Sequence, residues 1–98
     1  MIEVRQTDEF RAWLHGLRDG KAAARIVARI RRFEEGNPGD TRPVGAGVME
    51  MRVDYGPGYR VYYTRRGSVV VILLCGGDKR GQQRDIRRAK TLAAEIEE

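Results

Sequence analysis

The spacing of apolar residues changes along this chain, and the change restricts the class of fold that it can adopt. Between residues 10 and 33 apolar residues recur every three or four positions, whereas between residues 48 and 74 they alternate with polar residues or run together. The first spacing is typical of amphipathic helices and the second of strands. A helical spacing returns after residue 82. The sequence therefore predicts an α+β fold with a small antiparallel-rich sheet, an N-terminal helical hairpin and a C-terminal helix.

The predicted order of the elements is β-α-α-β-β-β-α. Residues 2–5 alternate as in a short strand, Thr7 caps the first helix, and Asp19-Gly20 separates it from a second helix that ends near Gly36. We expect a loop at residues 41–47. The three strands that follow and the last helix are predicted at residues 48–54, 59–63, 69–74 and 82–97. Because 98 residues suffice for one modest core, we predict a single domain over residues 1–98.

The chain is basic, with 19 Lys and Arg against 14 Asp and Glu and a net charge of +5, so a polyanion is a reasonable partner. Its one cysteine, Cys75, excludes an intrachain disulfide and a multi-cysteine metal site, and its place after an apolar run indicates the core. The longest apolar run is too short to span a bilayer, which takes about 20 residues, and the N-terminus has no signal-peptide pattern. We expect a cytoplasmic protein with no membrane partner.

The length of the turn near residue 57 decides which side chains share a face of the sheet. A two-residue turn, Pro57-Gly58, would mix the charge of Arg60 with the apolar residues. A three-residue turn at residues 56–58 gathers the apolar residues on one side, and we prefer it for that reason. The pairs that it predicts are Tyr55 with Tyr59, Val53 with Val61, and Met51 with Tyr63.

The opposite face of these two strands then carries charged and aromatic side chains, namely Glu50, Arg52, Asp54, Arg60 and Tyr62. In the preferred register Arg52 lies opposite Tyr62, and Asp54 lies opposite Arg60. Cross-strand ion pairs on a solvated sheet face would account for such a pattern. A surface that binds nucleic acid would account for it as well.

The last helix begins with basic residues and ends with acidic ones, an arrangement that opposes the helix dipole. The basic residues are Lys79, Arg80, Arg84, Arg87 and Arg88, and the acidic ones are Glu95, Glu97 and Glu98. An anion bound near the segment Gly76-Gly77-Asp78-Lys79 would explain this arrangement, because glycines let a ligand approach the backbone and free helix amides point outward.

A row of arginines also marks the second helix. Arg25, Arg29 and Arg32 lie at i, i+4 and i+7 on its outer side. This row could contact phosphate, but a solvated face or a partner-docking surface would account for it equally well. We therefore do not count these arginines among the catalytic candidates.

Several segments in the same order resemble the HigB-like "addiction module killer" branch of the RelE/ParE toxin superfamily. They are residues 36–40, 44–48, 50–52, 55–62 (Tyr-Gly-Pro-Gly-Tyr-Arg-Val-Tyr) and 74–79 (Leu-Cys-Gly-Gly-Asp-Lys), with Gln82, Asp85 and Ile86. The resemblance runs nearly end to end. It implies a toxin that cleaves messenger RNA on the ribosome and that a cognate antitoxin, a helix-turn-helix protein, holds in check. Operator DNA would be contacted only through the toxin–antitoxin complex.

The resemblance also implies which residues act. In RelE-type toxins a basic, aromatic-bearing sheet face receives the messenger RNA, and the arginine of the Gly-Tyr-Arg strand recurs in the active site; here it is Arg60. By their position on the same surface, the other catalytic candidates are Arg52, Tyr62 and Lys79. Supporting or RNA-binding roles are expected for Glu50, Gln82, Arg84 and Asp85.

The chemistry that the resemblance implies is attack of a ribose 2′-hydroxyl on the adjacent phosphorus, with no metal or other cofactor. Arginines suit this step because the transition state gains negative charge on the phosphate oxygens. The general base is not evident, since the one histidine, His15, lies off the apolar face of the first helix and far from the patch in sequence. Two alternatives stay open: a ParE-like toxin that poisons DNA gyrase, and a non-catalytic co-repressor that binds nucleic acid or antitoxin.

Overall fold

A computed structural model describes residues 2–96 of the protein. Within these residues it contains five strands, three α-helices and one short 3-10 helix. In chain order they are β1 (Glu3–Gln6), α1 (Asp8–His15), α2 (Gly20–Glu34), β2 (Thr41–Gly45), β3 (Val48–Val53), β4 (Tyr59–Arg66), β5 (Val70–Asp78), η1 (Lys79–Gly81) and α3 (Gln82–Glu95). The predicted order is confirmed, with β2 as an additional strand. The predicted helix end at residue 97 lies outside the described residues.

The described strands form one sheet in the order β1-β5-β4-β3-β2. β1 runs parallel to β5, and all other neighbours are antiparallel. The predicted α+β class with an antiparallel-rich sheet is therefore confirmed. Within residues 2–96, no helix is long and apolar enough to cross a membrane.

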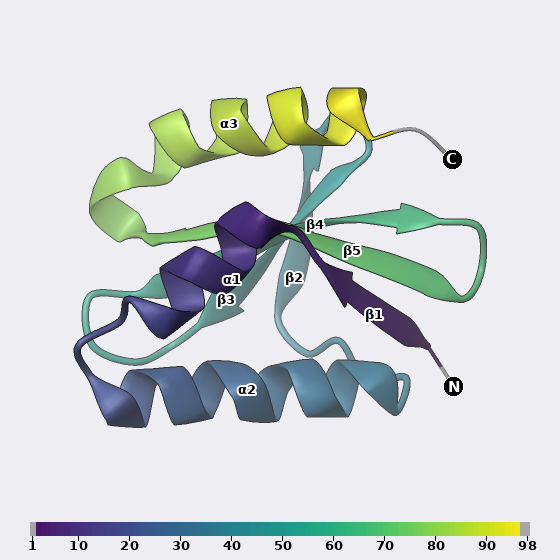
Figure 1. The fold of residues 1–98 in the computed structure, drawn as a ribbon. Coiled ribbons are helices and arrows are strands. Elements are labelled where there is room, and N and C mark those ends of the chain that lie inside the picture. Colours follow the sequence, from purple (N-terminus) through teal and green to yellow (C-terminus); the bar gives the residue numbers. More distant parts are fainter. Residues whose placement is uncertain (1, 97–98) are drawn as a thin grey trace.

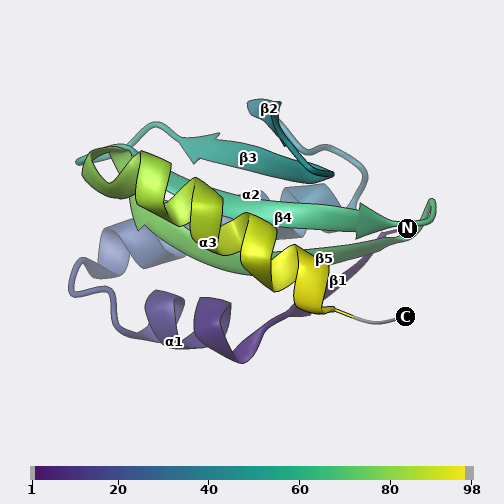
Figure 2. The same ribbon diagram turned by 90° about the horizontal axis from the view of Figure 1, so that it is seen from above.

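Helices cover both faces of the sheet: α1 and α2 lie on one side and α3 crosses the other (Figure 1, Figure 2). The core beneath α1 and α2 contains Phe10, Ile26, Ile30, Phe33, Met51, Val53, Val61, Tyr63, Val71 and Leu73. The core beneath α3 contains Val48, Tyr62, Ile72, Leu74, Cys75, Ala89 and Ala93. β5 contributes side chains to both cores, as its continuous apolar run predicted. Val69 is the exception, because it precedes the strand and is 54% exposed.

The loop predicted at residues 41–47 is wrong over Thr41–Gly45, which form β2. Pro43 and the nearby glycines are loop signals in the sequence. An edge strand tolerates proline, however, because one of its sides needs no hydrogen-bond partner. β2 is such an edge strand, with Pro43 opposite Met49 and a register shift between Pro43 and Gly45.

The predicted register of β3 and β4 is wrong by two residues. Val53 pairs with Tyr59, not with Val61, and residues 54–58 form a five-residue connection. Tyr55 lies outside the strand, and its ring lies under the guanidinium of Arg25, 4.6 Å from the ring centroid. The backbone then turns through Gly58, whose N–H donates to the carbonyl of Tyr55 at 3.1 Å and whose φ is +83°. Because the shift is an even number of residues, each side chain within the paired residues of β3 and β4 keeps its predicted face.

The predicted cap of the first helix is confirmed, and a second cap stands at the start of α2. The hydroxyl of Thr7 accepts the N–H of Phe10 at 3.0 Å and donates to the carbonyl of Leu74 at 2.6 Å, so the cap also fastens α1 to β5. The carboxylate of Asp19 accepts the N–H groups of Lys21 and Ala22 at the start of α2. Each cap satisfies amides that a helix start leaves without an internal partner.

We predict that Gly76→Ala lowers the free energy of unfolding by about 1–3 kcal/mol, the usual cost of forcing extra atoms into a packed interior. A Cβ at this position would lie 2.4 Å from the ring of Trp13. That ring packs against Phe10 and Tyr59, with centroids 5.7 and 6.3 Å apart, so it cannot move aside freely. Urea-induced unfolding measures the change.

Gly20→Ala is the matched control, because a Cβ there has no neighbouring atom within 4 Å and alanine favours helix. We expect this variant to be at least as stable as the wild type. Equal stability of Gly76→Ala and Gly20→Ala would contradict the tight packing of Trp13 on β5.

Candidate functional site

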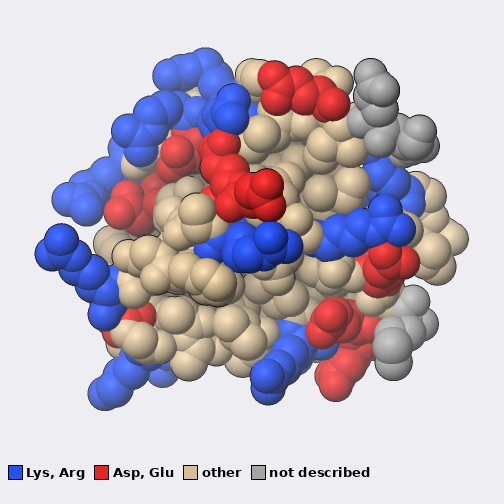
Figure 3. Space-filling view, in the orientation of Figure 1, with Lys and Arg blue, Asp and Glu red and all other residues tan. Residues whose placement is uncertain are grey.

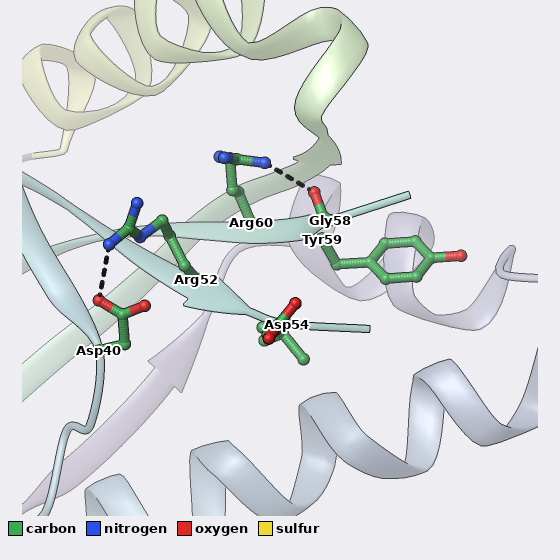
Figure 4. A pocket seen from close by; sticks show the side chains of 7 residues that line it. Asp40, Arg52, Asp54, Gly58, Tyr59 and Arg60 are labelled. Atoms are coloured by element: carbon green, nitrogen blue, oxygen red, sulfur yellow. Dashed lines mark hydrogen bonds and ion pairs between the residues drawn. The ribbon is translucent and has the colours of Figure 1, made fainter. Parts of the chain in front are cut away.

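An open part of the charged sheet face lies beside the start of α3. Here Arg52 of β3 and Arg60 of β4 are direct cross-strand partners, so both side chains rise on the same side of the sheet, as Figure 4 shows. The pocket that they line, called here the arginine pocket, also includes Asp40, Val53, Asp54, Gly58 and Tyr59. Arg52 and Arg60 therefore share a face as predicted, but they oppose each other, not Tyr62 and Asp54.

Arg52 is held loosely. Its side chain is 47% exposed, and its Nη2 donates to the Oδ1 of Asp40 at 3.1 Å. Asp40 is itself more than half exposed, and ion pairs between exposed side chains contribute about 0–1 kcal/mol. Arg52 can therefore exchange Asp40 for an anionic ligand at little cost.

Arg60 is held firmly. Its side chain is 11% exposed, and its Nη1 donates to the carbonyl of Gly58 at 2.8 Å. Its Nε lies 3.6 Å from the Oε2 of Glu50, close enough for an ion pair but without a hydrogen bond. A guanidinium fixed in this way keeps its orientation when a ligand arrives.

The carboxylate of Glu50 is the buried centre of the site, with no exposed side-chain surface. Its Oε1 accepts a hydrogen bond from Arg42 at 2.8 Å. Its Oε2 accepts hydrogen bonds from the hydroxyl of Tyr62 at 3.0 Å and from the amide of Gln82 at 2.9 Å. Burial alone would raise the pKa of Glu50, but these hydrogen bonds outweigh burial and lower the pKa below its usual range. Glu50 is therefore ionised at neutral pH.

Tyr62 is not on an open surface, which corrects its predicted place in an RNA-binding face. It lies opposite Glu50 and is fully buried in the core beneath α3. Burial and the neighbouring carboxylate of Glu50 raise the pKa of its hydroxyl, so Tyr62 stays protonated and donates to Glu50. A side chain in this position cannot stack on a base. Its role is to support Glu50.

Lys79 and Gln82 flank the site from the start of α3. Lys79 is exposed at the beginning of η1. Both it and Arg60 lie next to Gly58: a Cβ added at Gly58 would be 3.7 Å from the Cβ of Lys79 and 3.2 Å from the Nη1 of Arg60. The structure thus brings Lys79 beside Arg60. Gln82, the first residue of α3, reaches down to Glu50 and ties the helix start to the sheet.

Arg84 and Asp85 lie apart from the arginine pocket. They line a second pocket along β5, together with Trp13, Leu17, Pro57, Tyr59, Gly76, Gly77, Asp78 and Arg80. The side chain of Asp85 is 14% exposed, and burial raises its pKa. Asp85 packs directly against Gly77, because a Cβ added at Gly77 would lie only 1.9 Å from the Oδ2 of Asp85. The space that side chains at Gly76 and Gly77 would take is therefore filled by Trp13 and Asp85, and an anion bound near this segment stays a prediction.

The basic start of α3 has acidic partners within the protein. Arg80 pairs with Asp78, Arg84 with Asp85, and Arg88 with Glu9 of α1. Figure 3 shows acidic side chains among the basic ones in this region. The carboxylates of these ion pairs offset much of the positive charge at the start of α3, which would otherwise oppose the helix dipole. Two of the carboxylates, those of Asp78 and Glu9, come from outside the helix.

Sequence reasoning missed two residues of the site, Asp40 and Arg42. Asp40 lies just before β2 and Arg42 lies within it, where the sequence predicted no strand, and only the pairing of β2 with β3 brings Arg42 opposite Glu50. His15 is exposed on α1, as predicted. Cys75 is buried, as predicted, and burial raises the pKa of its thiol to about 12. Within residues 2–96, no three His, Cys, Asp or Glu side chains gather where they could hold a metal ion.

We predict that Glu50→Gln lowers the free energy of unfolding at pH 7 by about 3 kcal/mol, because breaking a buried ion pair leaves its partners unpaired. The pKa of Glu50 is lower in the folded protein than its unfolded value of about 4.3. Its contribution is therefore complete above the unfolded pKa and is lost as the pH falls through the folded pKa. Urea unfolding between neutral and acid pH measures this dependence.

In that experiment the stability of wild type should approach that of Glu50→Gln as the pH falls below about 4. Asp8→Asn removes a fully exposed carboxylate and is the control, with little effect at any pH. A constant difference between wild type and Glu50→Gln down to strong acid would contradict the assigned ionisation of Glu50.

Two comparisons with known proteins bear on the chain as a whole. The family described as "Phage derived protein Gp49-like (DUF891)" matches residues 12–97. An uncharacterized protein of Haemophilus influenzae (strain Rd) is 48% identical over 95 residues, which cover 97% of this chain and 96% of that protein. The match extends across both helical layers and every strand after β1. This chain therefore belongs to the phage-derived Gp49-like family, a family related to the RelE toxins.

Proposed function

We propose that this protein is the toxin of a type II toxin–antitoxin pair, HigB-like in kind, and that it cleaves messenger RNA on the ribosome. Membership of the Gp49-like family supports a toxin with an antitoxin partner. The observation that carries the cleavage activity is the pair of Arg52 and Arg60 in one pocket, with Lys79 beside it. Two planar guanidinium groups in one pocket, with a lysine at the neighbouring start of η1, suit a phosphodiester that gains negative charge as it reacts.

In the proposed reaction the 2′-oxygen of a ribose bonds to the adjacent phosphorus while the bond from phosphorus to the next 5′-oxygen breaks. Arg52 and Arg60 hold the non-bridging phosphate oxygens. The proton of the 2′-hydroxyl passes to a carboxylate of the pocket, that of Asp40 or Asp54, and the leaving 5′-oxygen takes a proton from Lys79. The products are a 2′,3′-cyclic phosphate and a 5′-hydroxyl.

The firm attachment of Arg60 favours it as the main stabiliser of the transition state. A group that is already oriented spends no free energy on reorganisation when charge develops. The carbonyl of Gly58 and the carboxylate of Glu50 supply that orientation. Glu50 itself is unsuited to accept the proton, because it has no exposed surface and both its oxygens already accept hydrogen bonds.

The proposed setting is the bacterial cytoplasm, with the ribosome and messenger RNA as partners. The antitoxin, a helix-turn-helix protein, would silence the toxin by covering the arginine pocket or by blocking entry into the ribosome. It would also carry the toxin to operator DNA, which the toxin itself does not read. No cofactor takes part in the steps assigned to Arg52, Arg60 and Lys79.

We predict that Arg60→Ala reduces messenger RNA cleavage by about 100- to 1000-fold, the usual effect of removing one preorganised donor from a developing oxyanion. The chain is induced in bacteria, and new 5′ ends of messenger RNA are mapped by primer extension. Arg60→Lys keeps the positive charge next to Glu50 but loses the planar fork, so it tests catalysis with less disturbance of the buried carboxylate. It too should cut poorly.

Arg65→Ala is the matched control, since Arg65 is an exposed arginine of the same strand outside the arginine pocket. It should cut as wild type does. Growth arrest without new 5′ ends, or with DNA-damage signalling, would overturn the ribonuclease assignment and favour gyrase poisoning. Cleavage by folded Arg60→Ala at the wild-type rate would place the active site elsewhere.

A further inference from the structure

The arginines of α2 lie close to the arginine pocket. Arg25, Arg29 and Arg32 form no ion pair with a carboxylate within residues 2–96. They line a further hollow, separate from the pocket along β5, together with Ala28, Val53 and Asp54. This hollow, called here the α2 hollow, therefore holds three guanidinium groups and one carboxylate, a local charge of about +2 at neutral pH.

The three arginines of α2 do different things. Arg29 is structural, because its guanidinium donates to the carbonyls of Arg52 at 2.5 Å and of Pro38 at 3.1 Å and so fixes α2 to β3. Arg25 lies over the ring of Tyr55, which orients its guanidinium but leaves the N–H groups at its edge free to donate. Arg32 is exposed. Arg25 and Arg32 are therefore available to an anion.

The α2 hollow continues the arginine pocket. Val53 and Asp54 line both of them, so the two hollows meet at the end of β3. Figure 4 shows Asp54 between the two arginines of the pocket and the ribbon of α2. A strand that leaves the arginine pocket across Asp54 therefore enters the α2 hollow and meets its arginines.

We propose that the α2 hollow binds the phosphates of the single-stranded RNA next to the bond that is cut. This inference rests on the proposed function, because it extends the substrate from one phosphodiester to a strand. Arg25 and Arg32 are seven residues apart, or about 10 Å along the helix axis, so they contact different phosphates of a chain and do not enclose one small anion. The continuity with the arginine pocket favours RNA over an acidic protein segment, which would need no such alignment.

A short 2′-O-methyl oligoribonucleotide is the probe, because without a 2′-hydroxyl proton it binds but cannot be cleaved. Fluorescence anisotropy measures its dissociation constant over a series of salt concentrations. Each phosphate contact with single-stranded nucleic acid contributes about 0.7 to the slope of log affinity against log salt. Arg25→Gln and Arg32→Gln should each lower that slope by about this amount and weaken binding several-fold at low salt.

The chain supplies a matched control and a variant of opposite sign. Arg31→Gln removes the same charge from the neighbouring residue of the same helix, but Arg31 points about 100° away from Arg32 and does not line the α2 hollow. It should leave the slope unchanged. Asp54→Asn removes the one carboxylate on the path and should tighten binding.

Each result bears on the inference separately from the proposed function. Equal losses from Arg31→Gln and Arg32→Gln would mean a general effect of charge and would overturn the inference. Wild-type affinity in both Arg25→Gln and Arg32→Gln, or no binding of the probe to the wild type, would overturn it as well. In either case, messenger RNA cleavage in cells that depends on Arg60 would still uphold the ribonuclease. Site-specific binding without any cleavage in cells would uphold the inference as an RNA-binding surface and overturn the ribonuclease.

Discussion

The buried carboxylate of Glu50 is the interaction on which the rest of the site depends. A charge without exposed surface is costly unless donors surround it. Here the donors come from three other elements: Arg42 of β2, Tyr62 of β4 and Gln82 of α3. These elements must keep one arrangement around the carboxylate for it to remain satisfied. Arg60, 3.6 Å from the same group, is positioned by that arrangement, so the geometry of the candidate active site and the stability of the fold share one origin.

The same interaction accounts for the edge of the sheet and for the path of the last helix. β2 is short and contains Pro43, which donates no hydrogen bond, so backbone pairing alone holds it weakly. The ion pair of Arg42 with Glu50 adds a side-chain attachment to β3. Gln82 does the same for α3, whose N-cap residue, Gly81, offers no side-chain hydrogen bond. The carboxylate of Glu50 therefore attaches β2 and the start of α3, where backbone pairing and a side-chain cap are weak or missing. Loss of this carboxylate should loosen both elements.

Sequence patterns predicted the faces of β3 and β4 correctly but not their partners or their burial. Alternation determines which side a residue occupies, and a shift of two leaves it unchanged, so Arg52 and Arg60 were rightly placed on one face. The register itself goes with a five-residue connection in which Tyr55 contacts Arg25, a tertiary contact that no local pattern contains. The burial of Glu50 and Tyr62 depends on α3 lying over this face. Apolar spacing shows that a helix has a buried side, but it does not show which strands that side covers.

The contrast between the two arginines of the pocket suits the proposed reaction. Arg60 is fixed before the substrate arrives, whereas Arg52 is paired with an exposed acid that holds it weakly. A phosphodiester entering the pocket competes with Asp40 for Arg52, and a bidentate contact with phosphate favours the substrate. Once Arg52 turns to the phosphate, the carboxylate of Asp40 is left without its partner at the moment when a 2′-hydroxyl must lose a proton nearby. Substrate binding would thus complete the proposed site by separating an ion pair and leaving a carboxylate of the pocket beside the reacting bond.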